Sequence, residues 1–242
     1  MNYALILAGG SGTRMGNTGV PKQFLTLKDK PVIIYTIENM LSCKEIDKII
    51  IVCNPSYVAY MHNMLIDFGL GNKVELTEGG KNRLESALNG VRYIEKRYGI
   101  TENDIFLAHD SVRIFTSNRI ISDNIEQAKR IGAATTVYVL EETIIEAGSD
   151  GLLYKAYPRE NRFTGQSPQT FNIQKFKNCV DKLSEDQKEV FTDLAEVFYA
   201  NNEKVYPVMG EKNNIKLTTP FDMTLAKMRL EEKDNAVISD DC

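Results

Sequence analysis

The chain has 242 residues and a formal net charge of −4, from 29 lysine and arginine residues against 33 aspartate and glutamate residues. With 43% hydrophobic and 26% charged residues, its composition is that of an ordinary globular protein, which excludes intrinsic disorder, a collagen-like repeat and a disulfide scaffold. The mild acidity argues against a general nucleic-acid-binding protein, which is usually basic, but it leaves room for a small anion in a local basic pocket.

The cysteines and the apolar runs bear on the compartment. No CxxC pair occurs among the four cysteines, Cys43, Cys53, Cys179 and Cys242, which favours free thiols in a reducing compartment over a zinc or redox motif. The N-terminus has no basic flank, its apolar run is too short for a signal peptide, and no apolar run reaches the ~18 residues of a membrane span. We therefore expect a cytoplasmic protein that binds neither membranes nor nucleic acid.

Strands and helices are predicted to alternate along the first part of the chain. Short apolar runs predict buried strands over residues 3–8, 48–53, 74–77, 104–108 and 134–139. Apolar residues at helical spacing predict helices over residues 33–41, 58–68, 84–94 and 118–131. This order predicts an α/β fold, with a three-layer, mostly parallel, Rossmann-like sheet that has helices on both faces and right-handed crossovers.

The alternation ends after Leu140. Residues 143–146 and 152–156 flank a Gly-containing turn and predict a hairpin with too few apolar residues for a core of its own. We interpret residues 141–157 as a β-arm that leans on a partner subunit. Helices are expected over residues 173–183, 193–201 and 221–232, which completes a single domain over residues 1–232, and the polar residues 233–242 are expected to form a flexible tail.

The ends of the predicted strands carry the residues that suggest a binding site. In parallel sheets a ligand lies beyond the carboxyl ends of the strands, where Gly9-Gly10, Gly79-Gly80 and His109-Asp110 occur. After the first strand, closely spaced glycines let backbone N–H groups approach an anion, and Arg14 and Lys22 add positive charge. This pattern suits a triphosphate better than a tight turn with two solvated charges.

Two familiar phosphate-binding motifs do not fit this loop. The sequence from Gly12 to Lys22 does not supply a Walker A motif, and the dinucleotide fingerprint fails because Gly16 comes one residue late. The second strand ends at Cys53-Asn54 rather than at the acidic residue that holds an adenosine ribose. A P-loop nucleotidase and a nicotinamide dehydrogenase are therefore disfavoured.

The loop, with Leu7-Ala8-Gly9-Gly10 and Pro21-Lys22-Gln23, resembles the signature of the cytidylyltransferases that couple CTP to polyol phosphates, a family that includes methylerythritol 4-phosphate and ribitol 5-phosphate enzymes. Further segments resemble the family in the same order, over residues 79–86, 109–113, 167–171, 192–193 and 214–218. The resemblance extends to about Lys227 and implies a nucleotidyltransferase fold.

The resemblance implies attack of a substrate phosphate on the α-phosphorus of CTP, with release of pyrophosphate. A phosphate monoester is largely dianionic at neutral pH and needs no general base, which agrees with the presence of only two histidines, His62 and His109. Such a reaction needs charge neutralisation and alignment. The resemblance assigns catalysis to Arg14, Lys22, Arg159 and Lys216, and a Mg²⁺ cofactor to Asp110.

Binding roles also follow from the resemblance. The residues implied for CTP are Leu7, Ala8, Gly9, Gly10, Gly80, Lys81, Asn82, Arg83, Ser86, Asp110 and Ser111. The residues implied for the polyol phosphate are Arg113, Thr143, Arg159, Ser167, Thr192 and Lys216, with Thr143 donated by the arm of a partner in a homodimer. Lys81 stands where many relatives have aspartate, and it cannot accept a hydrogen bond from the cytosine amino group. Ile114 replaces a common proline without removing charge.

The acceptor is predicted to be ribitol 5-phosphate, with methylerythritol 4-phosphate as the alternative. Ser111 and the segment Gly165-Gln166-Ser167 resemble the ribitol branch, and the polar Gln166 suits a more hydroxylated polyol. The product would then serve teichoic acid or another ribitol-phosphate polymer of a cell wall or capsule. Readings of other classes remain open: an inactive CTP-binding regulatory module, an assembly protein that uses the arm, and, as a nearer rival, a sugar-1-phosphate nucleotidyltransferase.

Overall fold

The computed structural model describes residues 1–10 and 19–240, and it describes side chains up to residue 232. Its centre is a sheet of seven strands in the order β11-β7-β10-β6-β1-β4-β5. The strands are β1 (Asn2–Ala8), β4 (Lys48–Cys53), β5 (Glu75–Glu78), β6 (Ile105–Asp110), β7 (Ala133–Val139), β10 (Phe163–Asn172) and β11 (Tyr206–Met209). β10 runs antiparallel to both of its neighbours, and the other pairings are parallel. The predicted mostly parallel α/β sheet is confirmed.

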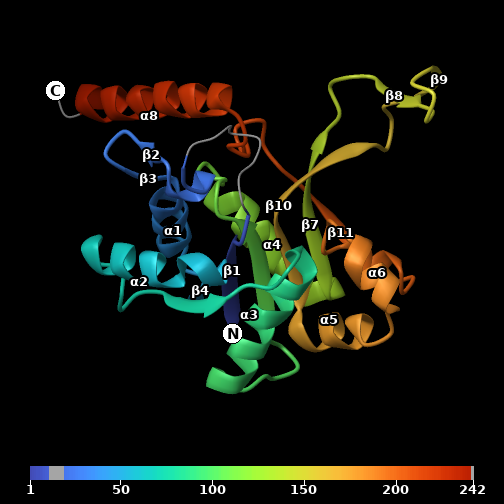
Figure 1. Ribbon diagram of the computed structural model, residues 1–242, viewed down its shortest axis with the longest axis horizontal. Coiled ribbons are helices and arrows are strands. Elements are labelled where there is room, and N and C mark those ends of the chain that lie inside the picture. The colour runs from blue at the N-terminus through green and yellow to red at the C-terminus, as the bar shows by residue number, and fades with distance from the viewer. Residues whose placement is uncertain (11–18, 241–242) are drawn as a thin grey trace.

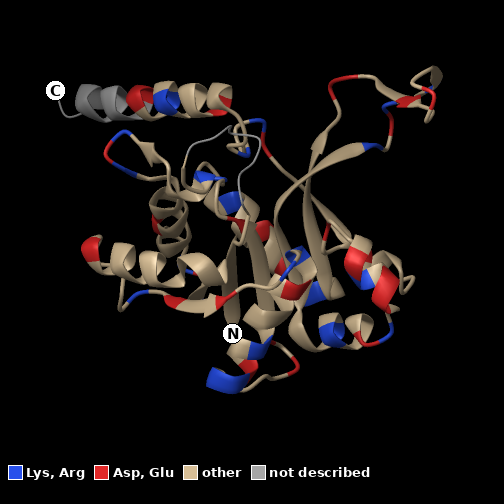
Figure 2. Cartoon of the chain, in the orientation of Figure 1, with Lys and Arg blue, Asp and Glu red and all other residues tan. Residues whose placement is uncertain are grey.

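Helices cover both faces of the sheet (Figure 1). The longer helices are α1 (Val32–Ser42), α2 (Val58–Asp67), α3 (Arg83–Tyr98), α4 (Asn118–Ile131) and α5 (Ile173–Val180), and the short ones are α6 (Glu185–Val190) and α7 (Glu196–Tyr199). Alternate residues of a strand point to opposite faces, so Tyr3 and Leu5 pack with α3, α5 and α7, whereas Ala4 and Ile6 pack with α1, α2 and α4. One core lies on each face of the sheet, so helices, sheet and helices form the three predicted layers. Figure 2 shows the sheet between the helices as mainly uncharged.

Two strands of the central sheet and one helix were not predicted from the sequence. β10 contains Gly165 and Pro168 among polar residues, a composition that lowers strand propensity, and its register shifts between Gly165 and Gln169. β11 is a short edge strand next to β7. Helix α6 begins at Ser184, which forms a capping box with Gln187, and the expected helix over 193–201 is reduced to α7.

The arm is present as predicted. Strands β8 (Ile144–Ala147) and β9 (Leu153–Tyr157) form an antiparallel hairpin that projects from the sheet (Figure 1). Its apolar side chains are open to solvent, with exposed fractions of 52% for Ile145 and 69% for Leu153. A surface of this kind is typical of an interface rather than of an isolated chain.

The C-terminal helix is longer than predicted. Helix α8 (Pro220–Asp240) runs through residues 233–240, where the sequence analysis expected a flexible tail. Its Ala226 packs with Leu27, Val112 and Leu217 in a small cluster above the sheet, beside the hairpin of β2 (Thr26–Leu27) and β3 (Lys30–Pro31). A polar composition does not prevent a helix from continuing once its first turns are docked.

Two further expectations can be compared with the described residues. Cys43, Cys53 and Cys179 are buried free thiols, and burial raises the pKa of Cys53 to about 11. Cys242 lies outside the described residues. Among the helices of the described residues, none is long and apolar enough to cross a membrane.

Candidate active site

A cavity of about 440 Å³ lies beyond the carboxyl ends of β1 and β6. Its lining comes from five short segments that are far apart in the sequence. They contribute Leu7, Gly9, Gly10, Lys22, Gln23, Gly80, Lys81, Asn82, Arg83, Ser86, Asp110, Ser111, Val112, Lys216 and Thr218. The three strand ends singled out by the sequence therefore meet at one site, as predicted.

The first glycine segment is held by a glutamine that the sequence analysis did not assign. Gln23 lies in the 3₁₀ turn Lys22–Phe24 and is buried, and its Nε2 donates to the carbonyl oxygens of Ala8 at 2.9 Å and Gly10 at 3.2 Å. These bonds fix the end of β1 and place the neighbouring Lys22 on the cavity wall. Arg14, the other predicted cation of this loop, lies outside the described residues.

The second glycine segment leads into helix α3. Asn82 is the N-cap, and its side chain accepts the N–H of Glu85 at 2.8 Å. The N–H of Gly80 donates to Ser86 Oγ at 3.0 Å, and a Cβ at Gly80 would lie 2.3 Å from Glu85 Cγ. The segment thus needs glycine, and it presents the positive end of a helix to the cavity.

Lys81 behaves differently from its neighbours. Its ammonium lies 3.1 Å from the carboxylate of Glu189 on α6, and this hydrogen bond raises the pKa of Lys81. Both side chains are mainly exposed, so the pair adds little stability. Lys81 lines the cavity as predicted, but its charge is directed to α6.

The carboxylate of Asp110 is surrounded by three cations, Arg83, Arg113 and Lys216. We call these four residues the Asp110 cluster. Arg83 Nη1 lies 2.6 Å from one carboxylate oxygen, and Lys216 Nζ at 3.0 Å and Arg113 Nε at 3.3 Å lie near the other. Burial alone would raise the pKa of Asp110, but the charges of Arg83, Lys216 and Arg113 hold it well below its usual range. Three cations around one anion leave an excess of positive charge, which suits a phosphate.

The donor set at Asp110 is compatible with Mg²⁺. This ion usually takes one or two carboxylates and completes its octahedral shell with waters and substrate phosphates. Among the described residues, Asp110 is the only carboxylate that lines this cavity, and no group of three metal-ligating side chains occurs. Asp110 could therefore supply the single protein carboxylate of such a site.

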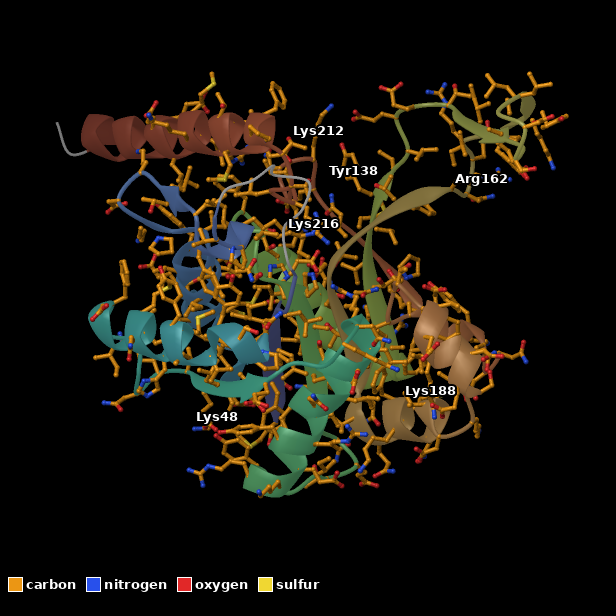
Figure 3. All side chains as sticks on the ribbon, in the orientation of Figure 1. Lys48, Tyr138, Arg162, Lys188, Lys212 and Lys216 are labelled. Carbon is orange, nitrogen blue, oxygen red and sulfur yellow. The ribbon has the colours of Figure 1, made fainter. Side chains whose placement is uncertain are left out.

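A second, smaller cavity of about 170 Å³ adjoins the first. Its lining is entirely polar or glycine: Arg83, Asp110, Arg113, Gly165, Gln166, Gln169, Thr192, Asp193 and Lys216. The two cavities share Arg83, Asp110 and Lys216, so the Asp110 cluster lies between them. Figure 3 shows Lys216 above the ends of the strands. Arg113, Thr192 and Lys216 are brought together as the sequence predicted for the acceptor.

Gln169 and Asp193 were not assigned by the sequence analysis. Gln169 Nε2 donates to Asp193 Oδ1 at 2.7 Å and to Thr135 Oγ1 at 2.9 Å, and its Oε1 accepts from Arg83 Nη2 at 3.3 Å. The pair therefore braces Arg83 from the side of the second cavity. Their signal was present in the sequence, since both belong to the quoted segments 167–171 and 192–193.

Three predicted acceptor contacts do not lie in either cavity. Ser167 is 1% exposed and its hydroxyl bonds inside the protein, so its side chain does not line either cavity. Thr143 and Arg159 are exposed at the base of the arm, where Arg159 Nη1 donates to the carbonyl oxygen of Glu141 at 2.9 Å. In a single chain they do not reach the Asp110 cluster's cavities.

Comparison with known proteins identifies the family of this chain. Residues 3–232 match the family described as IspD, 2-C-methyl-D-erythritol 4-phosphate cytidylyltransferase. The crystal structure of 4-diphosphocytidyl-2C-methyl-D-erythritol synthase from Anaerococcus prevotii is 25% identical, with a TM-score of 0.77 and 96% of each chain covered. The Francisella tularensis 2-C-methyl-D-erythritol 4-phosphate cytidylyltransferase is 24% identical, with a TM-score of 0.77 over 94% of this chain and 98% of that one.

A bifunctional IspDF from Campylobacter jejuni is 27% identical, with a TM-score of 0.73 over 92% of this chain and 53% of that longer one. The family match covers nearly the whole sequence, including the segments that build both cavities. The chain therefore belongs to the 2-C-methyl-D-erythritol 4-phosphate cytidylyltransferase family and is a CTP-dependent cytidylyltransferase that acts on a phosphorylated polyol.

Proposed function

We propose that the chain transfers the cytidylyl group of CTP to D-ribitol 5-phosphate, giving CDP-ribitol and pyrophosphate. The observation that carries this choice of acceptor is the lining of the second cavity. Among the described residues, every side chain that lines this cavity is polar or charged. A linear polyol phosphate with a hydroxyl on each unphosphorylated carbon can hydrogen-bond throughout such a cavity. A branched methyl group would find no apolar partner there and would leave polar groups unpaired.

Gln166 is the residue that favours ribitol most directly. Its Nε2 donates to the carbonyl oxygen of Glu211 at 3.0 Å, and its Oε1 accepts from Asn214 Nδ2 at 3.0 Å. Each of the two amide atoms keeps one further hydrogen-bonding position. A Cβ at Gly210 would lie 2.3 Å from Gln166 Oε1, so the glycine makes room for this orientation. The amide is thus held in place before an acceptor hydroxyl arrives.

The reaction is an in-line displacement. An acceptor phosphate oxygen forms a bond to the α-phosphorus of CTP, the bond from that phosphorus to the bridging oxygen breaks, and pyrophosphate leaves with the electron pair. Lys216 lines both cavities and would bridge the two reacting phosphates. We assign Lys22, together with Arg14 of the same loop, to the charge that develops on the triphosphate. Asp110 would hold Mg²⁺, which when bound supplies further neutralisation of the triphosphate.

We also propose that the active unit is a homodimer. The exposed apolar residues of the arm need a covering surface, and Thr143 and Arg159 lie near its base without a role in their own chain's cavities. An arm that crosses to a second copy would bring both residues toward the partner's acceptor cavity. Arg159 would then add a guanidinium, which suits a phosphate geometrically.

The second candidate is 2-C-methyl-D-erythritol 4-phosphate as the acceptor. The comparisons favour it, because the family description and the names of the similar solved structures all refer to methylerythritol enzymes. Both acceptors are five-carbon polyols with one phosphate, so the Asp110 cluster serves either. The choice between the two acceptors therefore depends on the lining of the second cavity alone.

Pyrophosphate release with CTP and Mg²⁺, measured in separate reactions with the two acceptors, tests the proposal. We expect turnover with ribitol 5-phosphate and at least 100-fold lower kcat/KM with methylerythritol 4-phosphate, about 2.7 kcal/mol of discrimination. The variant Gln166→Leu should narrow this ratio by lowering the ribitol rate. Faster turnover of methylerythritol 4-phosphate by the wild-type protein would establish the second candidate instead.

A further inference from the structure

A chain of hydrogen bonds lies beneath the floor of the two cavities, between the end of β6 and the middle of β10. His109 is completely buried, with an exposed fraction of 0%. Its Nδ1 lies 3.1 Å from Ser167 Oγ, and its Nε2 lies 3.1 Å from the backbone oxygen of Arg113. Ser167 Oγ lies 3.1 Å from the backbone nitrogen of Asp110. The chain begins and ends at two members of the Asp110 cluster.

For a neutral imidazole, the two ends of this chain of hydrogen bonds fix the position of every proton in it. The backbone N–H of Asp110 can only donate, so Ser167 Oγ accepts from it. The backbone carbonyl of Arg113 can only accept, so the proton of the imidazole sits on Nε2. His109 Nδ1 then carries a lone pair and accepts the Ser167 hydroxyl proton. The result is one neutral tautomer of His109.

Neighbouring groups agree with this assignment. The Thr116 hydroxyl donates to Asn214 Oδ1 at 2.8 Å, so its lone pair is available to the His109 Nε2–H at 3.3 Å. The charged groups that act on the imidazole are Asp110, Arg113 and Arg83, all of the Asp110 cluster. A neutral ring adds no repulsion to the three cations that the cluster holds together.

The same network reaches the segment that carries Lys216. Asn214 Nδ2 donates to the carbonyl oxygen of Ser167 at 2.9 Å, and Arg113 Nη1 donates to the carbonyl oxygen of Asn214 at 2.5 Å. Leu217, next to Lys216, donates its N–H to the carbonyl oxygen of Val112 at 3.0 Å. Hydrogen bonds therefore connect β6, β10 and the segment around Lys216 to one another beneath the two cavities.

We propose that His109 and Ser167 are positioning residues, which hold Asp110 and, through it, the cations of the Asp110 cluster in the arrangement that receives the reacting phosphates. Both side chains are buried and neither lines one of the two cavities. This inference rests on the proposed function in so far as the cluster carries the phosphates of CTP and the acceptor. It also explains why Ser167 is buried, because its hydroxyl bonds to Asp110 and His109 rather than facing a cavity.

A nuclear magnetic resonance measurement tests the proton positions without any assay. The chain has two histidines, and His62 is exposed and outside both cavities, so a His62→Gln variant leaves His109 as the single imidazole. With ¹⁵N-labelled histidine at pH 7.5, we expect a proton on Nε2 and a bare Nδ1. A proton on Nδ1, exchange between two tautomers, or a doubly protonated ring would overturn the assignment.

Kinetics of Ser167 variants test the positioning role. Loss of an orienting hydrogen bond behind a catalytic group typically costs 10–100-fold, so we expect Ser167→Ala to lose about that much kcat while the KM for CTP changes less than about threefold. Ser167→Thr keeps the hydroxyl and should restore kcat to within about threefold of wild type. Thr170→Val is the matched control, since its buried hydroxyl on the same strand has no partner among the described residues.

Three kinetic outcomes would contradict the positioning role of Ser167, and a fourth outcome would contradict only the proposed function. A Ser167→Ala protein with wild-type kcat, or a Ser167→Thr protein as slow as Ser167→Ala, would contradict it. Equal losses in Thr170→Val would attribute the effect to general disturbance of β10 and would also contradict it. Absence of wild-type turnover with both acceptors would defeat the proposed function, whereas the tautomer measurement would still decide the hydrogen-bond chain.

Discussion

Lys216 offers the sharpest perturbation, because it lines both cavities and its ammonium lies 3.0 Å from Asp110. An ammonium about 4 Å from one unit of charge on a reacting phosphate would gain about 4 kcal/mol at an effective dielectric constant of about 20. The Lys216 side chain is 37% exposed, and water weakens the interaction accordingly. A loss of about 3–4 kcal/mol of transition-state stabilisation in Lys216→Ala corresponds to a kcat lower by about 10²–10³.

Steady-state pyrophosphate release measures this loss, with Lys212→Ala as the matched control. Lys212 belongs to the same segment but pairs with Glu141 at the base of the arm, and Figure 3 shows it apart from Lys216. An exposed pair of this kind contributes about 0–1 kcal/mol, so the control should stay within about fivefold of wild type. A Lys216→Ala enzyme within threefold of wild type would refute the bridging role of this lysine.

Three more predictions concern the glycine segment, the buried imidazole and the arm. Gly80→Ala would force Glu85 aside and should weaken CTP binding about 10-fold or more in a calorimetric titration, and unchanged affinity would contradict the tight fit of this segment. Burial lowers the pKa of His109 to about 4, so between pH 6.5 and 4 the unfolded chain binds a proton that the folded protein does not. The free energy of unfolding should therefore fall by up to roughly 3 kcal/mol as the pH is lowered from 6.5 to 4, as measured by urea titrations at a series of pH values. An equal fall in His109→Gln would exclude the imidazole as the source of this pH dependence. Leu153→Glu should shift the sedimenting species from dimer to monomer, whereas a wild-type protein that already sediments as a monomer would refute the homodimer.

The sequence predicted the parallel part of the fold because β1, β4 and β6 are apolar on both faces. Runs such as Lys48–Cys53 have few alternatives to a buried strand. β10 escaped prediction because its Gly165 and Pro168 belong to a polar segment, and only its position between β6 and β7 makes it a strand. Tertiary context decided this element, since its apolar Phe171 fills the core between α5 and α7.

The candidate site was predictable wherever a residue type carries its own chemistry. The cations Lys22 and Lys216 and the carboxylate of Asp110 lie together as expected from their segments. Ser167 shows the limit of this reasoning, since a hydroxyl serves equally well in a cavity or beneath it, and burial decides between the two. Gln23 was overlooked for a similar reason, because a glutamine that ties a loop together has no distinctive spacing.

The polar second cavity should select a linear polyol phosphate over one with a methyl branch. A competition reaction with equal concentrations of ribitol 5-phosphate and methylerythritol 4-phosphate, limiting CTP and Mg²⁺ measures the ratio of the two kcat/KM values from the products alone. We expect CDP-ribitol to make up about 99% of the CDP-polyol formed, as a roughly 100-fold preference requires. A majority of the methylerythritol product would contradict it and make the second candidate the function.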